Sequence, residues 1–476
     1  MAASSRRRSR RRVRAALLVA LGAVCYANAL ANDLVWDDRL TAAAPVVTQR
    51  TGAYFRPLVM ASFAVDRALW HGAPAGFHLT NVVAHLAVAW LVGTLADALG
   101  LGPGVALAST LVFAAHPVQT EAVTYVSGRT DVFCALFVLL GALAWRRAAG
   151  AADRFAVASA AAMAAAVLSK EAAIAMPLAL LVPGAHPAVR PPRPVLPLAV
   201  GSAGLLGWTL AAHPGIGLAG LLGRLPAIAV AALTYLRLLV WPADLHLERF
   251  TAVSGWPLAT VAVWVPILAL LVAAARRMRG GWFLLALAAL AYGPVSGVVP
   301  VYPAIADRAL FTPEHFLYLP LVGLVPLVAG ALAPLLPRRP AAIALALVLA
   351  VWTPIVIRRN RDWRDDETLF RQTLRYDPPA ARVWFNLGNL SLAAGRLDEA
   401  ERLYREALAR EPHDAATHLN LGIVFQRERK LADAEEQYRD AIAANPQLRD
   451  AYRGLAALLA ARGEDAAAAR VLDHVR

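Results

Sequence analysis

The chain has 476 residues, of which 59% are apolar and only 17% are charged, and its formal net charge is +14. An ordinary soluble domain is about 45–50% apolar and about 25% charged. A soluble protein of this composition would expose large apolar patches. The composition therefore excludes an ordinary cytosolic enzyme, a disordered chain and a disulfide-stapled secreted domain. It indicates a polytopic membrane protein over most of the length.

The positive charge is concentrated beside a predicted membrane helix. Seven arginines lie within residues 6–14, directly before an apolar run. Such a cluster orients a membrane helix with its charges in the cytoplasm, and we prefer this interpretation to nucleic-acid binding. Cys25 and Cys134 both lie in apolar runs and indicate neither a disulfide nor a metal site. Lys170 and Lys430 are the only lysines among many arginines and alanines, which is typical of a GC-rich, bacterial genome.

About eleven apolar stretches approach the roughly 20 residues that a membrane helix needs. We expect spans at residues 13–31, 80–99, 104–116, 131–145, 155–169, 172–184, 195–213, 261–275, 281–301, 315–336 and 341–357. Residues 225–241 are either a twelfth span or a re-entrant or interfacial segment. Eleven spans place the arginine clusters at the N-terminus, 146–154, 190–193, 276–279 and 338–339 on one side, so we favour the second interpretation.

The first span is either a retained signal-anchor or a cleavable signal peptide. Ala29-Leu30-Ala31 resembles a cleavage site, but ten further spans follow, so we expect a retained anchor. The N-terminus is then cytoplasmic. The polar loops and everything after Arg358 lie on the opposite, periplasmic or lumenal, face.

A repeat of 34 residues begins after residue 380. Leu387-Gly388 recurs as Leu421-Gly422, and an aromatic residue, alanines and a proline recur in step. This is the tetratricopeptide (TPR) pattern. We divide the chain into a membrane domain at 1–357, a linker with a partial repeat helix at 358–380 and a TPR domain at 381–476. The repeats are 381–414, 415–448 and a partial one at 449–476.

Asn386 and Asn420 lie one repeat apart on the helix that lines the concave face of a TPR array. Asparagine there can hydrogen-bond an extended peptide backbone. The alternative is that these asparagines belong to the repeat consensus, and we favour it.

Ionisable residues gather on the expected outer face, where their cost in a membrane makes them functional candidates. The Asp37–Asp38 pair suits a general base or a cation site. Arg129 could bind a phosphate or form a helix-capping ion pair with Asp131. Lys170 could bind a lipid phosphate or be neutralised by Glu171. The other candidates are His116, Glu121, Arg308, Glu314 and His315. His78, Asn81 and His85 share a helical face and indicate polar packing in preference to a metal site.

Taken in order, these segments resemble one family. They are Trp36-Asp37-Asp38, Tyr54-Phe55-Arg56-Pro57-Leu58, Phe77-His78-Leu79-Thr80-Asn81, the segment from His116-Pro117 to Glu121, Ser127-Gly128-Arg129-Thr130-Asp131, Ser169-Lys170-Glu171, Glu314-His315-Phe316-Leu317-Tyr318 and Arg359-Asn360-Arg361-Asp362-Trp363. The chain is similar to the transmembrane-and-TPR-repeat O-mannosyltransferases (TMTC family) and their bacterial relatives. The fold class is then all-α: a GT-C-like membrane domain followed by TPRs.

The resemblance implies transfer of a mannose-like sugar from a dolichyl- or undecaprenyl-type polyprenyl phosphate to a serine or threonine of an acceptor protein, without metal or cofactor. It implies that Asp37 or Asp38 is the catalytic base. It places His116, Glu121, Arg129, Asp131, Lys170, Glu171, Arg308, Glu314 and His315 around the donor phosphate or the acceptor. The TPRs would bind the acceptor protein, and the expected location is the bacterial inner membrane, or the endoplasmic reticulum membrane in a eukaryote.

Gln119 stands where the family often has a histidine, and His315 replaces a usual arginine, so the donor sugar and the acceptor stay open. The alternative function is a non-catalytic membrane scaffold whose TPRs hold an envelope assembly. A transporter is disfavoured because two related halves with interrupted spans are not visible.

Overall fold

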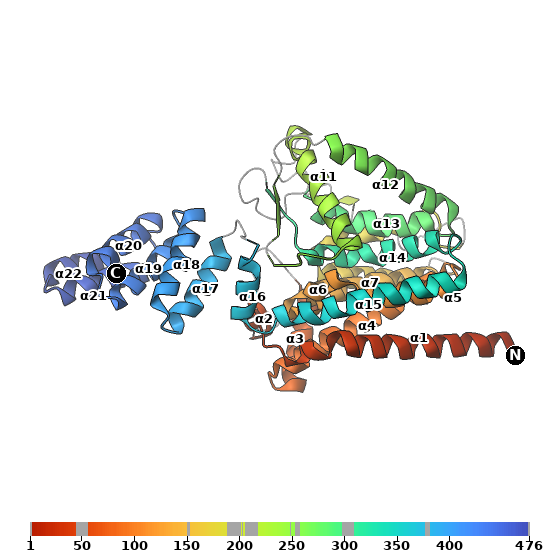
Figure 1. The fold of residues 1–476 in the computed structure, drawn as a ribbon, viewed down its shortest axis with the longest axis horizontal. Coiled ribbons are helices and arrows are strands. Elements are labelled where there is room, and N and C mark those ends of the chain that lie inside the picture. The colour runs from red at the N-terminus through yellow and green to blue at the C-terminus, as the bar shows by residue number, and fades with distance from the viewer. Residues whose placement is uncertain are drawn as a thin grey trace. The chain divides into compact units, whose positions relative to one another are not determined.

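The computed structural model describes residues 2–43, 56–149, 153–187, 201, 203–204, 218–247, 249–252, 258–297, 309–376 and 381–474. The chain divides into two compact units, Met1–Asp365 and Asp366–Arg476 (Figure 1). Both consist almost entirely of helices, as predicted.

The first unit begins with α1 (Ala2–Tyr26), η1 (Ala27–Ala31), α2 (Asp38–Ala43), α3 (Pro57–Trp70), α4 (Pro74–Ala98), α5 (Pro103–Ala115), η2 (Pro117–Gln119), α6 (Thr120–Thr124), η3 (Val126–Gly128), α7 (Arg129–Trp145), α8 (Arg154–Ser169), η4 (Glu171–Ala175) and α9 (Met176–Ala179). It continues with α11 (Leu218–Val240), β1 (Phe250–Ala252), α12 (Leu258–Arg277), α13 (Gly281–Tyr292), η6 (Gly293–Val295), β2 (Ala309–Phe311), η7 (Glu314–Leu317), α14 (Tyr318–Leu332) and α15 (Arg338–Asp362). Prolines open α3, α4 and α5, where a missing N–H costs nothing.

Six helical segments among the described residues are long and apolar enough to cross a membrane: Arg8–Ala31, Pro74–Ala98, Val126–Trp145, Gly223–Val240, Glu314–Leu332 and Arg338–Asp362. Shorter apolar helices are Pro103–Ala115, Arg154–Ser169 and Gly281–Val295. The predicted count of eleven spans stays a prediction, and the expected span at 195–213 lies outside the described residues apart from 201, 203 and 204.

Three segments differ from the expectation. Residues 172–184 do not form one span, because Lys170 is extended and the short helices η4 and α9 follow. Residues 225–241 lie mostly in the single continuous helix α11, so the segment has no re-entrant turn within it. A short antiparallel pair, β1 with β2, joins two connecting segments and adds a minor strand element to the all-α fold.

Two arginines of the first unit, Arg14 and Arg146, contact the ends of neighbouring helices and turns. Arg14, at the middle of α1, pairs with Asp97 at the end of α4 at 2.9 Å. Arg146, after α7, donates to the carbonyls of Ala98 and Gly184, each at 2.8 Å. A Cβ added at Gly184 would lie 2.6 Å from the Cα of Gly280, so the turns after α9 and α12 also meet here. We call this region the arginine end.

Asn360, near the C-terminal end of α15, hydrogen-bonds the C-terminal end of α1 and the residues that follow it. Its side-chain amide donates to the Cys25 carbonyl at 2.8 Å and to Asn28 Oδ1 at 2.9 Å. Its Oδ1 accepts from the Thr124 hydroxyl at 2.7 Å, and its backbone carbonyl accepts from Asn32 at 2.9 Å. Asn360 thus joins the first and last long helices at what we call the polar end.

The second unit consists of α16 (Asp366–Leu374), α17 (Ala381–Ala393), α18 (Leu397–Arg410), α19 (Ala415–Arg427), α20 (Leu431–Ala444), α21 (Arg449–Ala461) and α22 (Asp465–Asp473). The helices form antiparallel pairs, α17 with α18, α19 with α20 and α21 with α22. Gly388 and Gly422 leave room for the buried rings of Tyr404 and Tyr438, since an added Cβ would approach these rings to 2.7 and 2.8 Å.

Candidate active site at the polar end of the membrane unit

Asp37 and Asp38 are adjacent but have opposite environments. Asp38 is fully buried, and its Oδ1 accepts from the backbone N–H of Ser127 at 2.7 Å. Its Oδ2 accepts from the N–H groups of Val126 at 3.2 Å and Val35 at 3.3 Å. Burial raises the pKa of Asp38 to about 7, against these hydrogen bonds. Asp37 is exposed. Of the two carboxyl groups, therefore, only that of Asp37 is open to a substrate.

Arg129 is enclosed by side chains and a backbone carbonyl that bind its guanidinium. Its side chain is fully buried and pairs with Asp66 at 2.5 Å. It also donates to Asn81 Oδ1 at 2.6 Å and to the Phe77 carbonyl at 3.0 Å, and it lies over the Phe63 ring at 4.3 Å. The partner of Arg129 is thus Asp66, neither Asp131 nor a solvent-accessible phosphate position.

Lys170 and Glu171 do not pair with each other. Lys170 Nζ contacts Asp131 Oδ1 at 2.6 Å, and both side chains are almost fully buried. Glu171 binds Arg56 through two hydrogen bonds of 2.6 and 2.9 Å. Burial alone would raise the pKa of Glu171, but Arg56 outweighs it and holds the pKa below its usual value. These pairs attach the turn after α8 to α7 and to the start of α3.

The short helix η7 connects the other ionisable groups. His315 donates from Nδ1 to Glu121 Oε1 at 2.8 Å and from its backbone N–H to Oε2 at 3.0 Å. Burial would raise the pKa of Glu121, yet His315 and Arg359 hold it below its usual value. The next residue, Phe316, has its ring 5.7 Å from Lys170 Nζ. The preceding residue, Glu314, is fully buried.

Glu314 neutralises a pair of buried arginines. Its Oε2 contacts Arg359 at 3.3 Å, and its Oε1 lies 3.9 Å from Arg249. Oε1 also accepts from the backbone N–H of His246 at 2.5 Å. Burial, with help from Arg249, lowers the pKa of His246 to about 4, so that imidazole is neutral at pH 7. Arg249 and Arg359 thus share Glu314, and Arg359 also pairs with Asp362 at 3.2 Å.

Tyr125 links the two acidic groups of the site. Burial raises its pKa well above the usual value, and the charges of Asp38, Asp37 and Glu121 add to this effect. Its ring stacks on Trp363 with 5.3 Å between centroids. The charges of the Asp37–Asp38 turn and of Glu121 therefore both act on this one side chain.

The other predicted residues have separate roles. The ring of His116 is buried, accepts from the Val118 N–H and donates to the Leu239 carbonyl at 3.0 Å. His85 bonds Tyr318 at 2.8 Å, so the stripe of His78, Asn81 and His85 is polar packing, as predicted. Arg308 lies outside the described residues. In the second unit, Asn420 donates to Asn389 at 2.7 Å, whereas Asn386 is half-buried.

Five residues of this region were not among the predicted site residues: Arg56, Asp66, Tyr125, Arg249 and Arg359. Arg56 and Arg359 belong to motifs of the resemblance but had no predicted role. Asp66 had a usable signal, since it is an acid within the otherwise apolar helix α3. Gln119 is also unexpected, because it is fully buried and neither of its amide atoms has a hydrogen-bond partner among the described residues. Within the same residues, no group of histidine, cysteine or carboxylate side chains is arranged to hold a metal ion.

Comparison with known proteins adds two kinds of likeness. A family model described as Tetratricopeptide repeat matches residues 379–447. The chain is 36% identical over 126 residues to Protein O-mannosyl-transferase Tmtc1 of Drosophila melanogaster, which covers 26% of this chain and 14% of that protein. It is 30% identical over 160 residues to Protein O-mannosyl-transferase TMTC4 of Homo sapiens, covering 26% of this chain and 22% of that protein.

The matched regions are thus less than a quarter of the length of these relatives. The solved structure titled "Crystal structure of MamA" is 19% identical and covers 28% of this chain and 75% of that one, but its TM-score of 0.23 is too low to bear on the fold. The matched relatives carry one family name. Part of the chain is thus similar to the TMTC protein O-mannosyl-transferases.

Proposed function

We propose that this chain is a membrane glycosyltransferase that moves a mannose-like sugar from a polyprenyl phosphate to a serine or threonine hydroxyl of an acceptor protein on the periplasmic or lumenal face. The observation that carries the proposal is an exposed carboxylate, Asp37, at the same end of the unit as a cluster of cations. The names of the curated relatives support the same reaction class.

The chemistry needs a base on one side of the anomeric carbon and cations on the other. The acceptor hydroxyl bonds to the anomeric carbon and loses its proton to Asp37 as the bond to the lipid phosphate oxygen breaks. The electron pair leaves on the polyprenyl phosphate, whose charge is stabilised by cationic donors. Arg249, whose Nε has no hydrogen-bond partner among the described residues, and His315 are the donors we assign to this role.

Asp37 is the better base of the two aspartates. A base must reach the hydroxyl, and Asp37 is exposed whereas Asp38 is fully enclosed by backbone donors. Asp38 instead fastens the turn before α2 to η3, and this contact fixes the position of its neighbour. We therefore assign Asp37 as the catalytic base and Asp38 as a positioning residue.

His315 is a partly exposed donor. Its Nδ1 donates to Glu121, and its side chain keeps 22% of its surface exposed. Acceptor binding by the second unit, with Asn386 and Asn420 on the concave face of the repeats, completes the proposal.

The test is transfer by purified protein from polyprenyl-phosphate mannose to a serine- and threonine-rich peptide. We expect Asp37→Asn to lower the rate by about 10²–10⁴-fold, the usual contribution of a general base. Asp33→Asn is the matched control, because Asp33 is also exposed in the same connection, and it should transfer at the wild-type rate.

Equal rates in the two variants would refute Asp37 as the base. Absence of transfer by wild type, with complementation of a deletion strain by Asp37→Asn, would favour the scaffold instead.

A further inference from the structure

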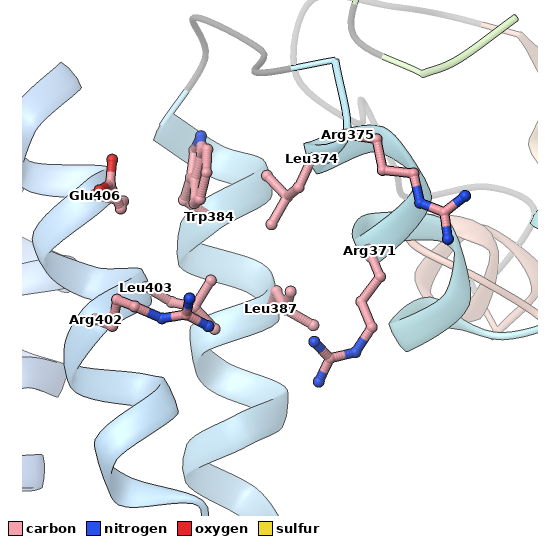
Figure 2. A pocket seen from close by; sticks show the side chains of 8 residues that line it. All are labelled: Arg371, Leu374, Arg375, Trp384, Leu387, Arg402, Leu403 and Glu406. Carbon is pink, nitrogen blue, oxygen red and sulfur yellow. The ribbon is translucent and has the colours of Figure 1, made fainter.

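The second unit contains two hollows at equivalent positions of the repeats. The first measures about 410 Å³ and lies between α16, α17 and α18 (Figure 2). The second measures about 360 Å³ and lies between α20, α21 and α22. Trp384 and Leu387 of the first correspond to Tyr452 and Leu455 of the second, two repeats later. Since the same eight repeat positions line both, the hollows follow from the repeat geometry.

Each hollow has an apolar floor and an arginine on either side. In the first, Arg371 comes from α16 and Arg402 from α18, and Figure 2 shows both side chains near Leu387 on α17. In the second, Arg439 and Arg470 hold the same two positions. Such a site suits a carboxylate that is flanked by an apolar side chain.

The two arginines of the first hollow are held differently. Arg371 pairs with Glu367 and Glu399, each at 2.8 Å, so its guanidinium is already fixed at the rim. Arg402 is exposed and forms no ion pair within the described residues. Arg402 therefore has a full charge available for a partner.

The middle junction keeps one arginine, Arg405, at the position of Arg371 and Arg439, but it carries acidic residues at two other positions. Glu436 occupies the position of Arg402 and Arg470, and Asp440 that of Glu406 and His474. His418, which replaces the aromatic ring of the floor, hydrogen-bonds Gln437 at 2.9 Å. This face of the unit thus alternates between basic, acidic and basic junctions, and the aromatic floor occurs only beside the arginines.

We propose that the grooves between successive second helices of the repeats bind an acidic, extended segment of a partner protein, with a carboxylate between the arginines and an apolar side chain on Trp384 or Tyr452. Charge complementarity selects this occupant. The surface differs from the concave face that carries Asn386 and Asn420, so the proposal does not depend on the transferase activity.

The test uses the full chain in detergent micelles and a fluorescent peptide that alternates glutamate with leucine. Fluorescence anisotropy should show binding that a glutamine–leucine peptide lacks. Arg402→Glu should weaken it by about tenfold, the effect of one charge-assisted hydrogen bond. Glu436→Arg should strengthen it, because it gives the middle junction the missing arginine. Arg449→Glu is the matched control and should bind as wild type, since Arg449 is exposed outside the hollows.

Equal affinity of all three variants would overturn the proposal, as would equal binding of the two peptides. Binding of anionic lipid vesicles that depends on Arg402, without peptide binding, would also overturn it and would assign the surface to a membrane.

Discussion

Asp38 is enclosed while the adjacent Asp37 is exposed, so their carboxyl groups respond differently to pH. The raised pKa of Asp38 means that folding favours its protonated form. Its stabilising contribution is therefore complete below the ordinary pKa of 3.8 and is lost as the pH rises through about 7. At neutral pH the backbone donors hold a carboxylate that burial disfavours.

Asp38→Asn should remove this dependence. Between pH 4.5 and pH 7.5 the melting temperature of the wild-type protein in detergent should fall more than that of the variant, because only the wild type loses a proton there. A thermal-shift series across this range measures the difference. Parallel curves for the two proteins would show that Asp38 does not titrate in the folded state.

The buried ion pair of Arg129 with Asp66 should stabilise the folded protein. Asp66→Asn would leave the buried guanidinium without its counter-charge, which costs about 3–5 kcal/mol. We expect little folded protein on size-exclusion chromatography, whereas Asp33→Asn should give the wild-type yield. A well-folded Asp66→Asn protein would mean that Arg129 is not held by this pair.

Close helix packing explains several glycines at the scale of elements. A Cβ at Gly323 of α14 would lie 2.2 Å from the Leu284 carbonyl oxygen of α13, a backbone atom that cannot move aside. A Cβ added at Gly104, near the start of α5, would have no other atom within 4 Å. Position 104 therefore has room for a side chain and position 323 does not, although both lie in apolar helices.

Gly323→Ala should separate α13 from α14 and destabilise the unit by at least about 1–3 kcal/mol, the usual cost of overpacking. Gly104→Ala should be neutral or slightly stabilising, since alanine is the better helix former. Melting temperatures of the two purified variants give the comparison. A Gly323→Ala protein as stable as Gly104→Ala would contradict the tight contact.

Helical elements were predictable where one local rule decides them. The TPR helices follow from residues at fixed spacing, and the contacts of Tyr404 with Gly388 and of Tyr438 with Gly422 explain why those residue types recur. Residues 172–184 were mispredicted because hydropathy ignores the ion pairs that hold Lys170 and Glu171 in a turn. Local sequence does not reveal a partner far away along the chain.

At the scale of the whole membrane unit, the polar end lies at the C-terminal end of α1, whereas the arginine end meets α1 at Arg14, near the middle of the helix. Arg39 is exposed at the polar end and Arg147 at the arginine end. The motifs drew attention to the ionisable residues of this region, and their roles stay predictions. The pairings there were not predictable, since Arg129 with Asp66 and Arg359 with Glu314 bring together separate helices.

The expected orientation can be tested with single cysteines. The native Cys25 and Cys134 are buried and should react little. In intact bacterial cells a membrane-impermeant maleimide should label Arg39→Cys, whereas Arg147→Cys should react only after lysis. Labelling in the reverse order would invert the topology, and labelling of both before lysis would rule out a membrane barrier between the two ends.

Asn360 also affects how the protein must be made. Its partners Cys25, Asn28 and Asn32 leave the ribosome long before Asn360 itself does. The C-terminal end of α1 therefore lacks its hydrogen bonds to Asn360 while most of the unit is synthesised. Contacts so distant in sequence form late during folding. The hydrogen bonds of the polar end are consequently completed near the end of biogenesis.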